Sequence, residues 1–277
     1  MLKPLVVSSI VLTGLLTPAA PATAQTSTVV SESANAESTN AEPATLEPAT
    51  AGPTVASQGC VVLLHGLSRT SRAMKPLARA FKKAGYKVVN VDYPSRHHPI
   101  EVLAPLAVEK LGASQCEQQP VVHFVTHSLG GILVRYYLSE DSIPNLGRVV
   151  MLAPPNQGSE VVDGYKNIPG FRLLNGPAGM QLGTDDQSIP RQLPAVEFEL
   201  GVIAGSKTFN PILSLQLPNP DDGKVSAQSA RVEGMSDYLL LPVTHTFLMR
   251  SRQVIAQTIH FIEHGGFLRN DQTLDNR

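Results

Sequence analysis

Ser128 has the sequence surroundings of a catalytic nucleophile. It lies between an apolar segment, residues 121–125, and a segment with helical spacing of apolar side chains, residues 129–138. The residues at the junction, 126–131, read THSLGG. A serine on a sharp strand-to-helix turn adopts a strained backbone conformation that exposes its hydroxyl above the sheet. Serine is also a common helix N-cap, but strand, turn and small residues together favour a nucleophile.

The stretch VHFVTHSLGG resembles the nucleophile turn of bacterial triacylglycerol lipases and esterases, within the α/β-hydrolase superfamily. The resemblance covers most of residues 59–266 and includes LHGL at 64–67, PNQGS at 155–159 and DGKVS at 222–226. Thr126 replaces the first glycine of the Gly-x-Ser-x-Gly motif, where small Bacillus-type lipases have alanine. The resemblance implies an α/β fold and ester hydrolysis that needs neither a metal nor an organic cofactor.

A serine nucleophile needs a base, and histidine is the usual base near neutral pH. Hydrolases of the resembled type carry the triad in the chain order serine, acid, histidine, which leaves His245, His260 and His264. The last two fall one turn apart within the final expected helix. His245 follows the last expected strand, so we predict that it is the base. His65 is expected to shape the turn near the oxyanion site, and the His127 side chain to point away from the nucleophile.

The acid that orients His245 has three candidates, Asp221, Asp222 and Asp237. Asp237 lies at the amino end of a strand, on the wrong side of the sheet. Asp222 precedes a glycine, as the acid does in the Asn-Asp-Gly loops of similar lipases. Asp221 takes the asparagine place of that pattern and is expected to cap the turn. We therefore predict Asp222 as the acid.

An oxyanion hole needs two donors that face the developing negative charge. The resemblance implies that one is the backbone N–H of Leu129, directly after the nucleophile. It implies that the other is the backbone N–H of Leu67, after the His-Gly pair that follows the first strand.

The elements that must position these residues alternate along the chain. Parallel strands need crossover connections, and helices usually supply them. We predict a mostly parallel central sheet flanked by helices, with the reactive residues at the carboxyl ends of the strands. Strands are expected at 60–64, 87–91, 121–125, 148–152, 201–204 and 238–241, and helices at 71–84, 99–111, 129–138 and 247–264.

Residues 156–194 form a long insertion before the fifth expected strand. Loops of this length inside compact domains are uncommon and usually functional, so we interpret the insertion as a partly helical lid or pocket wall over Ser128. Its apolar side chains either contact an acyl chain or pack the insertion onto the sheet, and the sequence leaves both open. They are Val161, Val162, Tyr165, Ile168, Phe171, Leu173, Leu174, Met180 and Leu182.

The chain begins with the pattern of an export signal, residues 1–24. Lys3 supplies the positive start, an apolar run follows at 5–16, and residues 22–24 read ATA, a typical cleavage site. The apolar run is too short for the roughly 20 residues of a membrane-spanning helix. Residues 25–58, rich in Ala, Thr, Ser, Glu and Pro, are predicted as a disordered linker. Residues 59–277 are predicted as the catalytic domain, located in the periplasm or secreted.

The chain has two cysteines, Cys60 and Cys116, each before an expected strand. Cysteine pairs of exported proteins are commonly bridged, although spacing alone does not prove a bridge. In the strand order that the resemblance implies, the two strands are neighbours. We therefore hypothesise a disulfide between these cysteines.

Composition narrows the possible partners. Hydrophobic residues make up 42% of the chain and the formal net charge is −1, so no positive field is available to attract nucleic acid. We predict a carboxylic-ester hydrolase that forms an acyl-Ser128 intermediate on a small-molecule or lipid ester with an apolar acyl group. We also predict transient contact of this hydrolase with a lipid surface. The same residues would also suit a thioesterase, an amidase or an acyltransferase, and the fold alone would suit a catalytically silent binding protein.

Overall fold

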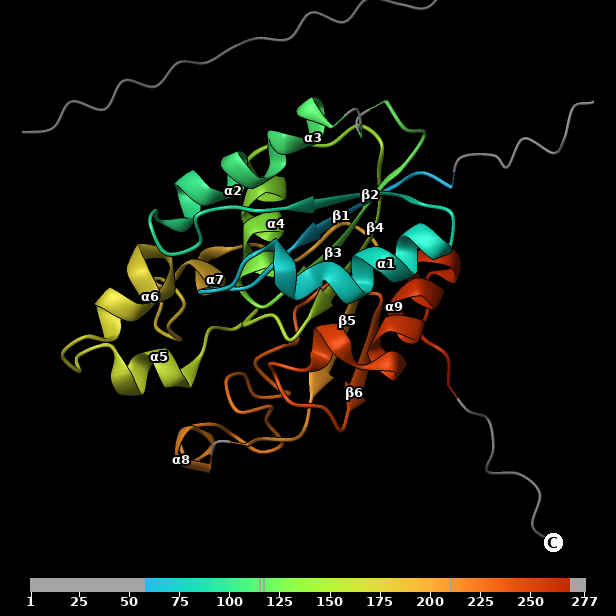
Figure 1. Ribbon diagram of the computed structural model, residues 1–277. Helices are drawn as coiled ribbons and strands as arrows, with labels where there is room; N and C mark the ends of the chain where they lie inside the picture. The colour runs from blue at the N-terminus through green and yellow to red at the C-terminus, as the bar shows by residue number, and fades with distance from the viewer. Residues whose placement is uncertain (1–57, 115, 117, 210, 270–277) are drawn as a thin grey trace, which may run out of the picture. The chain divides into compact units, whose positions relative to one another are not determined.

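The protein is built around one continuous parallel sheet. The computed structural model describes residues 58–114, 116, 118–209 and 211–269, and the expected signal (1–24) and nearly all of the expected linker (25–58) lie outside them. Six strands pair in the order β2-β1-β3-β4-β5-β6, each parallel to its neighbours (Figure 1). They are β1 (Cys60–Leu64), β2 (Lys87–Val91), β3 (Val122–His127), β4 (Leu146–Leu152), β5 (Leu200–Gly205) and β6 (Asp237–Leu241).

Helices connect the strands, and three segments that the sequence predicts as single helices are each divided in two. One of these segments divides before α1 (Lys75–Lys83), which has Pro76 in its first turn. Another divides before α9 (Arg252–His264), which the Ser251 side chain caps by accepting from Val254 N (3.4 Å). Among the described residues, no helix is both long and apolar enough to cross a membrane. The helices and 3-10 turns are η1 (Ser71–Met74), α1 (Lys75–Lys83), α2 (Ile100–Val108), α3 (Lys110–Ala113), α4 (Leu129–Glu140), α5 (Glu160–Tyr165), α6 (Phe171–Met180), α7 (Ile189–Gln192), α8 (Pro211–Ser214), η2 (Leu248–Arg250) and α9 (Arg252–His264).

The core has two layers, one on each face of the sheet. Side chains of β1 alternate between them, because successive residues of a strand point to opposite faces. Val62 and Leu64 belong to the cluster that includes α2 and α4, whereas Val61 and Leu63 belong to the cluster that includes α1 and α9. Helix α2 packs beside α4, and α1 beside α9 (Figure 1). Burial on both faces explains why the strand is apolar throughout.

A disulfide joins the amino ends of two neighbouring strands. Cys60 begins β1 and is paired in register with Val122 of β3. Cys116 lies just before β3, and the two cysteines are bonded with their Cα atoms 5.7 Å apart. Both side chains are fully buried. The hypothesis of a Cys60–Cys116 disulfide is confirmed.

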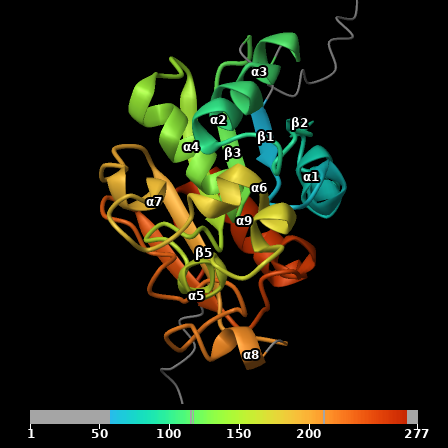
Figure 2. The same cartoon turned by 90° about the vertical axis from the view of Figure 1, so that its left-hand side faces the viewer.

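The insertion at 156–194 contains helices α5, α6 and α7. Arg135 of α4 binds both of its ends: Nη1 donates to the Asn156 carbonyl (3.0 Å), and Nη2 donates to the Pro194 carbonyl (3.0 Å). Burial lowers the pKa of Arg135 to about 10. Helices α5 and α6 lie beyond the carboxyl ends of β1 and β2, on the same side of the structure as α8 (Figures 1 and 2).

Candidate active site

Ser128 occupies a strained turn between β3 and α4. Its backbone angles, φ 53° and ψ −121°, lie in a region that side-chain-bearing residues rarely adopt. The turn forms with Thr126, fully buried, at the position where the motif has glycine. Gly130 is required by close packing, since a Cβ there would lie 2.8 Å from the Leu64 carbonyl oxygen. Strand, strained serine and helix therefore follow one another as the sequence predicts.

Asp222 and His245 meet above the sheet. His245 Nδ1 lies 2.8 Å from Asp222 Oδ2, and both side chains are buried. The other carboxylate oxygen, Oδ1, accepts from the backbone N–H groups of Lys224 (3.0 Å) and Val225 (2.9 Å). The backbone N–H of His245 in turn donates to the Asp222 carbonyl (3.0 Å). The loops after β5 and β6 are thus joined by side chain and main chain, with the imidazole held between them.

The two other candidate acids lie elsewhere. Asp221 accepts from Gly223 N (2.7 Å) and from the Ser214 hydroxyl, which is the turn-capping role predicted for it. Asp237, at the amino end of β6, pairs with Arg269. Among these carboxylates, Asp222 is the one hydrogen-bonded to His245.

A pocket of about 270 Å³ opens over Ser128 and is also lined by His245 and Leu67. Most of its wall is apolar and comes from the insertion and from α8: Val161, Val162, Tyr165, Phe171, Leu182 and Leu213. Other apolar side chains of the insertion point outward, with Ile168 49%, Leu173 84% and Leu174 64% exposed. The insertion therefore divides its apolar residues between the pocket and the outer surface.

The loop that carries Leu67 passes tightly against Ser128. A Cβ on Gly66 would lie 2.7 Å from His127 Nδ1 and 3.1 Å from Ser128 Cβ, so only glycine fits there. Leu129 begins α4, and the first N–H groups of a helix have no acceptor within the helix. The two residues predicted to supply oxyanion donors thus lie on the segments that flank Ser128.

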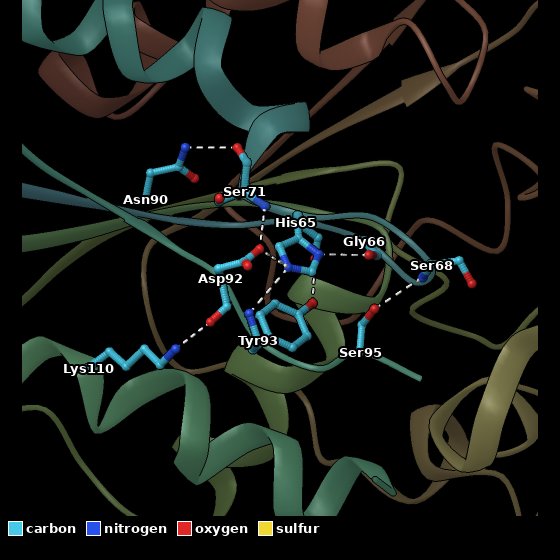
Figure 3. A network of polar contacts seen from close by, with 9 residues as sticks. All are labelled: His65, Gly66, Ser68, Ser71, Asn90, Asp92, Tyr93, Ser95 and Lys110. Carbon is cyan, nitrogen blue, oxygen red and sulfur yellow. Dashed lines mark hydrogen bonds and ion pairs between the residues drawn. The ribbon is translucent and has the colours of Figure 1, made fainter. Parts of the chain in front are cut away.

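His65 contacts the backbone at the start of this loop, in agreement with the prediction that it shapes the turn (Figure 3). Its ring stacks on Tyr93 with centroids 4.1 Å apart, and the Tyr93 hydroxyl donates to the His65 carbonyl. Nδ1 donates to the Gly66 carbonyl (2.9 Å), so Nε2 is the acceptor for Tyr93 N (3.4 Å). Burial is the main cause of the lowered pKa of His65. A neutral, doubly hydrogen-bonded imidazole therefore fixes the start of the loop that carries Leu67, the predicted oxyanion loop.

His127 has a role that the sequence did not indicate. It lines the same pocket as Ser128, its Nε2 donates to the His245 carbonyl (3.0 Å), and the two rings lie with centroids 4.7 Å apart. Burial and the neighbouring His245 lower the pKa of His127 well below its ordinary value. His127 therefore supports the His245 loop as a neutral donor. The partners are 118 residues apart in sequence, and no local pattern signals the contact.

Solved structures with a similar fold include bacterial lipolytic enzymes. The mature form of Bacillus licheniformis lipase BlEst2 is 21% identical with a TM-score of 0.59, over 77% of this chain and 94% of that one. The metagenomic carboxyl esterase MGS0156 is 18% identical with a TM-score of 0.57, over 73% and 68%. Legionella pneumophila phospholipase PlaB is 16% identical with a TM-score of 0.57, over 74% and 57%. At these identities the likeness concerns the fold.

Sequence comparison assigns the family. A comparison with curated protein sequences gave no match. The family model described as "Alpha/beta hydrolase family" matches residues 61–256, well over half of the chain. This range includes Ser128, Asp222 and His245. The chain belongs to the alpha/beta hydrolase family.

Proposed function

We propose that this hydrolase is a serine carboxylic-ester hydrolase that acts through an acyl-Ser128 intermediate on esters with an apolar acyl group. The observation that carries the proposal is the hydrogen-bonded pair of Asp222 and His245 (2.8 Å), with His245 lining the same pocket as the strained Ser128. A nucleophile, a base and an orienting acid in one site are the parts that acyl transfer through serine requires.

In the proposed reaction, His245 removes the Ser128 proton as Oγ attacks the ester carbonyl. The backbone N–H groups of Leu67 and Leu129 stabilise the resulting oxyanion. His245 then donates the proton to the leaving alcohol and activates water against the acyl-enzyme. Asp222 keeps the Nδ1 proton in place and stabilises the imidazolium that forms transiently.

The acyl group is proposed to occupy the apolar wall that the insertion contributes, with 156–194 acting as a lid or pocket wall. Phe171 lines the pocket from the same helix, α6, whose Leu173 and Leu174 are exposed. Leu213 of α8 lines the pocket between the exposed Ile212 and neighbouring Leu215. We propose that these exposed side chains contact the lipid surface that presents the ester, because they adjoin the pocket directly.

The proposal includes export to the periplasm or the medium. The Cys60–Cys116 disulfide supports this location, because structural disulfides persist mainly in oxidising compartments.

Ser128→Ala tests the function. We expect hydrolysis of p-nitrophenyl octanoate to fall by about a million-fold, by analogy with loss of the nucleophile in other serine hydrolases. Labelling by a fluorophosphonate should disappear, while the circular dichroism spectrum stays that of the wild type. Undiminished hydrolysis in the variant would exclude Ser128 as nucleophile.

A substrate panel at matched acyl chain separates the related activities. Octanoyl esters, an octanoyl thioester and an octanoyl amide distinguish esterase, thioesterase and amidase, and an added alcohol acceptor reveals acyl transfer. A wild-type protein that hydrolyses none of them and resists labelling would be a silent binding protein.

A further inference from the structure

The charged side chains that line the catalytic pocket are all of one sign. Arg69 reaches it from the oxyanion loop, and Lys224 from the loop that carries Asp222. No aspartate or glutamate is among the described residues of the pocket lining. A pocket with a largely apolar wall therefore carries two cations near its nucleophile.

Neither cation has an ion-pair partner among the described residues. Arg69 Nη2 donates to the Thr246 hydroxyl (3.4 Å), a neutral group. The charge of Asp222 attracts Lys224, but among the described residues the ion pair of this carboxylate is with His245 and not with Lys224. Both residues are exposed to solvent along the pocket, and partial desolvation together with the charge of Arg69 lowers the pKa of Lys224, so the two cations repel one another. An anion bound between them would relieve this repulsion.

Both cations flank the histidine from which a leaving alcohol would take its proton. Arg69 contacts Thr246, the residue directly after His245, and Lys224 lies two residues beyond Asp222. The apolar wall, by contrast, comes mainly from α5, α6 and the residues that follow them. Because the proposed function assigns the apolar wall to the acyl portion of the ester, the cations are left to contact its alcohol portion.

A second hollow of about 580 Å³ shares Arg69 with the catalytic pocket. It is lined by Ser68, Ser95, Arg96 and His97 as well as by Arg69. Its one carboxylate among the described residues, that of Asp92, accepts from Ser71 N (2.7 Å) and lies 3.6 Å from His65 Nε2, while Lys110 Nζ donates to the Asp92 backbone carbonyl (Figure 3). The hollow thus offers polar groups to the part of a substrate that extends past Arg69.

We propose that the preferred substrate is an ester whose alcohol portion carries an anionic group, a phosphate or a carboxylate, which Arg69 and Lys224 bind. This inference rests on the proposed ester hydrolysis and names the class of ester. Guanidinium and ammonium groups both bind such oxyanions by charge-assisted hydrogen bonds. An amphiphile with an apolar acyl chain and an anionic head fits both halves of the site.

The test compares octanoyl esters that differ only in the alcohol: glycerol (neutral), choline (cationic), glycerol phosphate and glycolate (both anionic). All are used as monomers at low ionic strength. We expect kcat/KM for an anionic ester to exceed that for the neutral ester by about tenfold and that for the choline ester by more, because cations in a partly exposed site contribute modest selectivity. Added salt should reduce the preference. The ratio between the phosphate and glycolate esters identifies which anion is favoured.

Variants assign the preference to the two side chains. Arg69→Gln with Lys224→Met should bring the anionic-to-neutral ratio close to one. Arg69→Glu should raise the rate on the choline ester relative to wild type, a gain that misfolding cannot produce. The control, Arg79→Gln with Lys83→Met, removes exposed cations of α1 and should keep the wild-type ratio.

The outcomes separate this inference from the proposed function. A wild-type protein that is labelled by fluorophosphonate and hydrolyses the neutral ester, but shows no anionic preference, overturns the inference alone. The same holds if the preference survives in the Arg69→Gln, Lys224→Met variant. Absence of both labelling and hydrolysis in the wild type would overturn the proposed function instead.

Discussion

Asp222 uses both of its carboxylate oxygens, and the two have different partners. Oδ2 faces His245 Nδ1, while Oδ1 accepts from the backbone N–H groups of Lys224 and Val225. Two N–H donors on one oxygen fix the carboxylate plane, so the second oxygen is aimed at the imidazole. An amide in this position would keep its oxygen on the backbone donors and turn its NH2 group toward His245.

Asp222→Asn should therefore reduce turnover by about four orders of magnitude and leave substrate binding largely intact. The amide would favour the histidine tautomer whose Nδ1 accepts, and it would not balance the imidazolium charge. Steady-state kinetics on p-nitrophenyl octanoate, with KM and kcat resolved, measure this effect.

Asp221→Asn is the matched control and should change turnover by no more than a few-fold. The hydrogen-bond partners of Asp221 are Gly223 N and the Ser214 hydroxyl. The side-chain oxygen of asparagine can accept from Gly223 N, and its NH2 group can donate to the Ser214 hydroxyl. If Asp221→Asn instead abolishes turnover while Asp222→Asn does not, the assignment of the two aspartates is reversed.

The residue types of the candidate site could be predicted from the sequence because local patterns carry them. Ser128 lies on a strand-to-helix junction, Asp222 precedes a glycine in a turn, and His245 follows a strand. The contact of His127 with the His245 carbonyl has no such pattern. It depends on how the loop after β6 folds back across the end of β3, which is decided by packing of distant segments.

At the scale of elements, the strands were predictable because each is a short apolar run buried on both faces. The divided helices were not predictable, since a capping serine at 251 interrupts a segment whose apolar spacing continues on both sides.

The attachment of the insertion could not be predicted from the sequence either. Its length suggested a lid, but its attachment through Arg135 to Asn156 and Pro194 depends on a single buried side chain of α4.

The outward side chains of α6 give the lid proposal a test. In Leu173→Ser with Leu174→Ser, we expect hydrolysis of an emulsified long-chain ester to fall by about tenfold, because each exposed leucine would otherwise bury apolar surface in the lipid. Hydrolysis of a monomeric short-chain ester should change by less than twofold. The two rates are compared at equal enzyme concentration in a pH-stat assay.

Leu268→Ser provides the control for this experiment, since that leucine is 51% exposed in the segment after α9. It should leave both rates close to those of the wild type. An equal loss on soluble and emulsified esters in the α6 variant would indicate damage to the pocket and would contradict a role in lipid contact.

At the scale of the whole molecule, the parallel sheet follows from the alternation of strands and helices along the chain, whereas the disulfide could only be hypothesised, with the help of the strand order that the resemblance implies. The protonation state of the buried histidines could not be predicted from the sequence at all. Three buried histidines, His65, His123 and His127, have lowered pKa values, with burial as the main cause. For His123 the pKa falls from 6.5 to about 4. Composition gives the number of histidines, but only the fold shows which of them must stay neutral.

His123 makes the consequence measurable. Its Nδ1 accepts from the backbone N–H of Arg148 (2.9 Å), and its ring meets Tyr86 edge to face. The Arg148 charge also lowers its pKa, while Glu199, paired with Arg148 at 2.8 Å, acts in the opposite direction. Protonation of Nδ1 would remove the acceptor and place a cation beside Arg148. The folded state therefore resists a proton that the unfolded chain accepts.

We expect His123 to lower the free energy of unfolding as the pH falls from about 6.5 toward 4, because in that window this histidine gains a proton in the unfolded chain but not in the folded state. Below about 4, folded His123 is protonated as well and its contribution levels off. In His123→Asn, whose side-chain oxygen can still accept from Arg148, the slope of the free energy of unfolding against pH should decrease by up to one proton, or about 1.4 kcal/mol per pH unit.

Urea unfolding at a series of pH values measures this slope in the wild type and in His123→Asn, with His98→Asn, at an exposed position, as the control that retains the wild-type slope. Identical slopes in the wild type and His123→Asn would mean that His123 is protonated in the folded state as readily as in the unfolded chain.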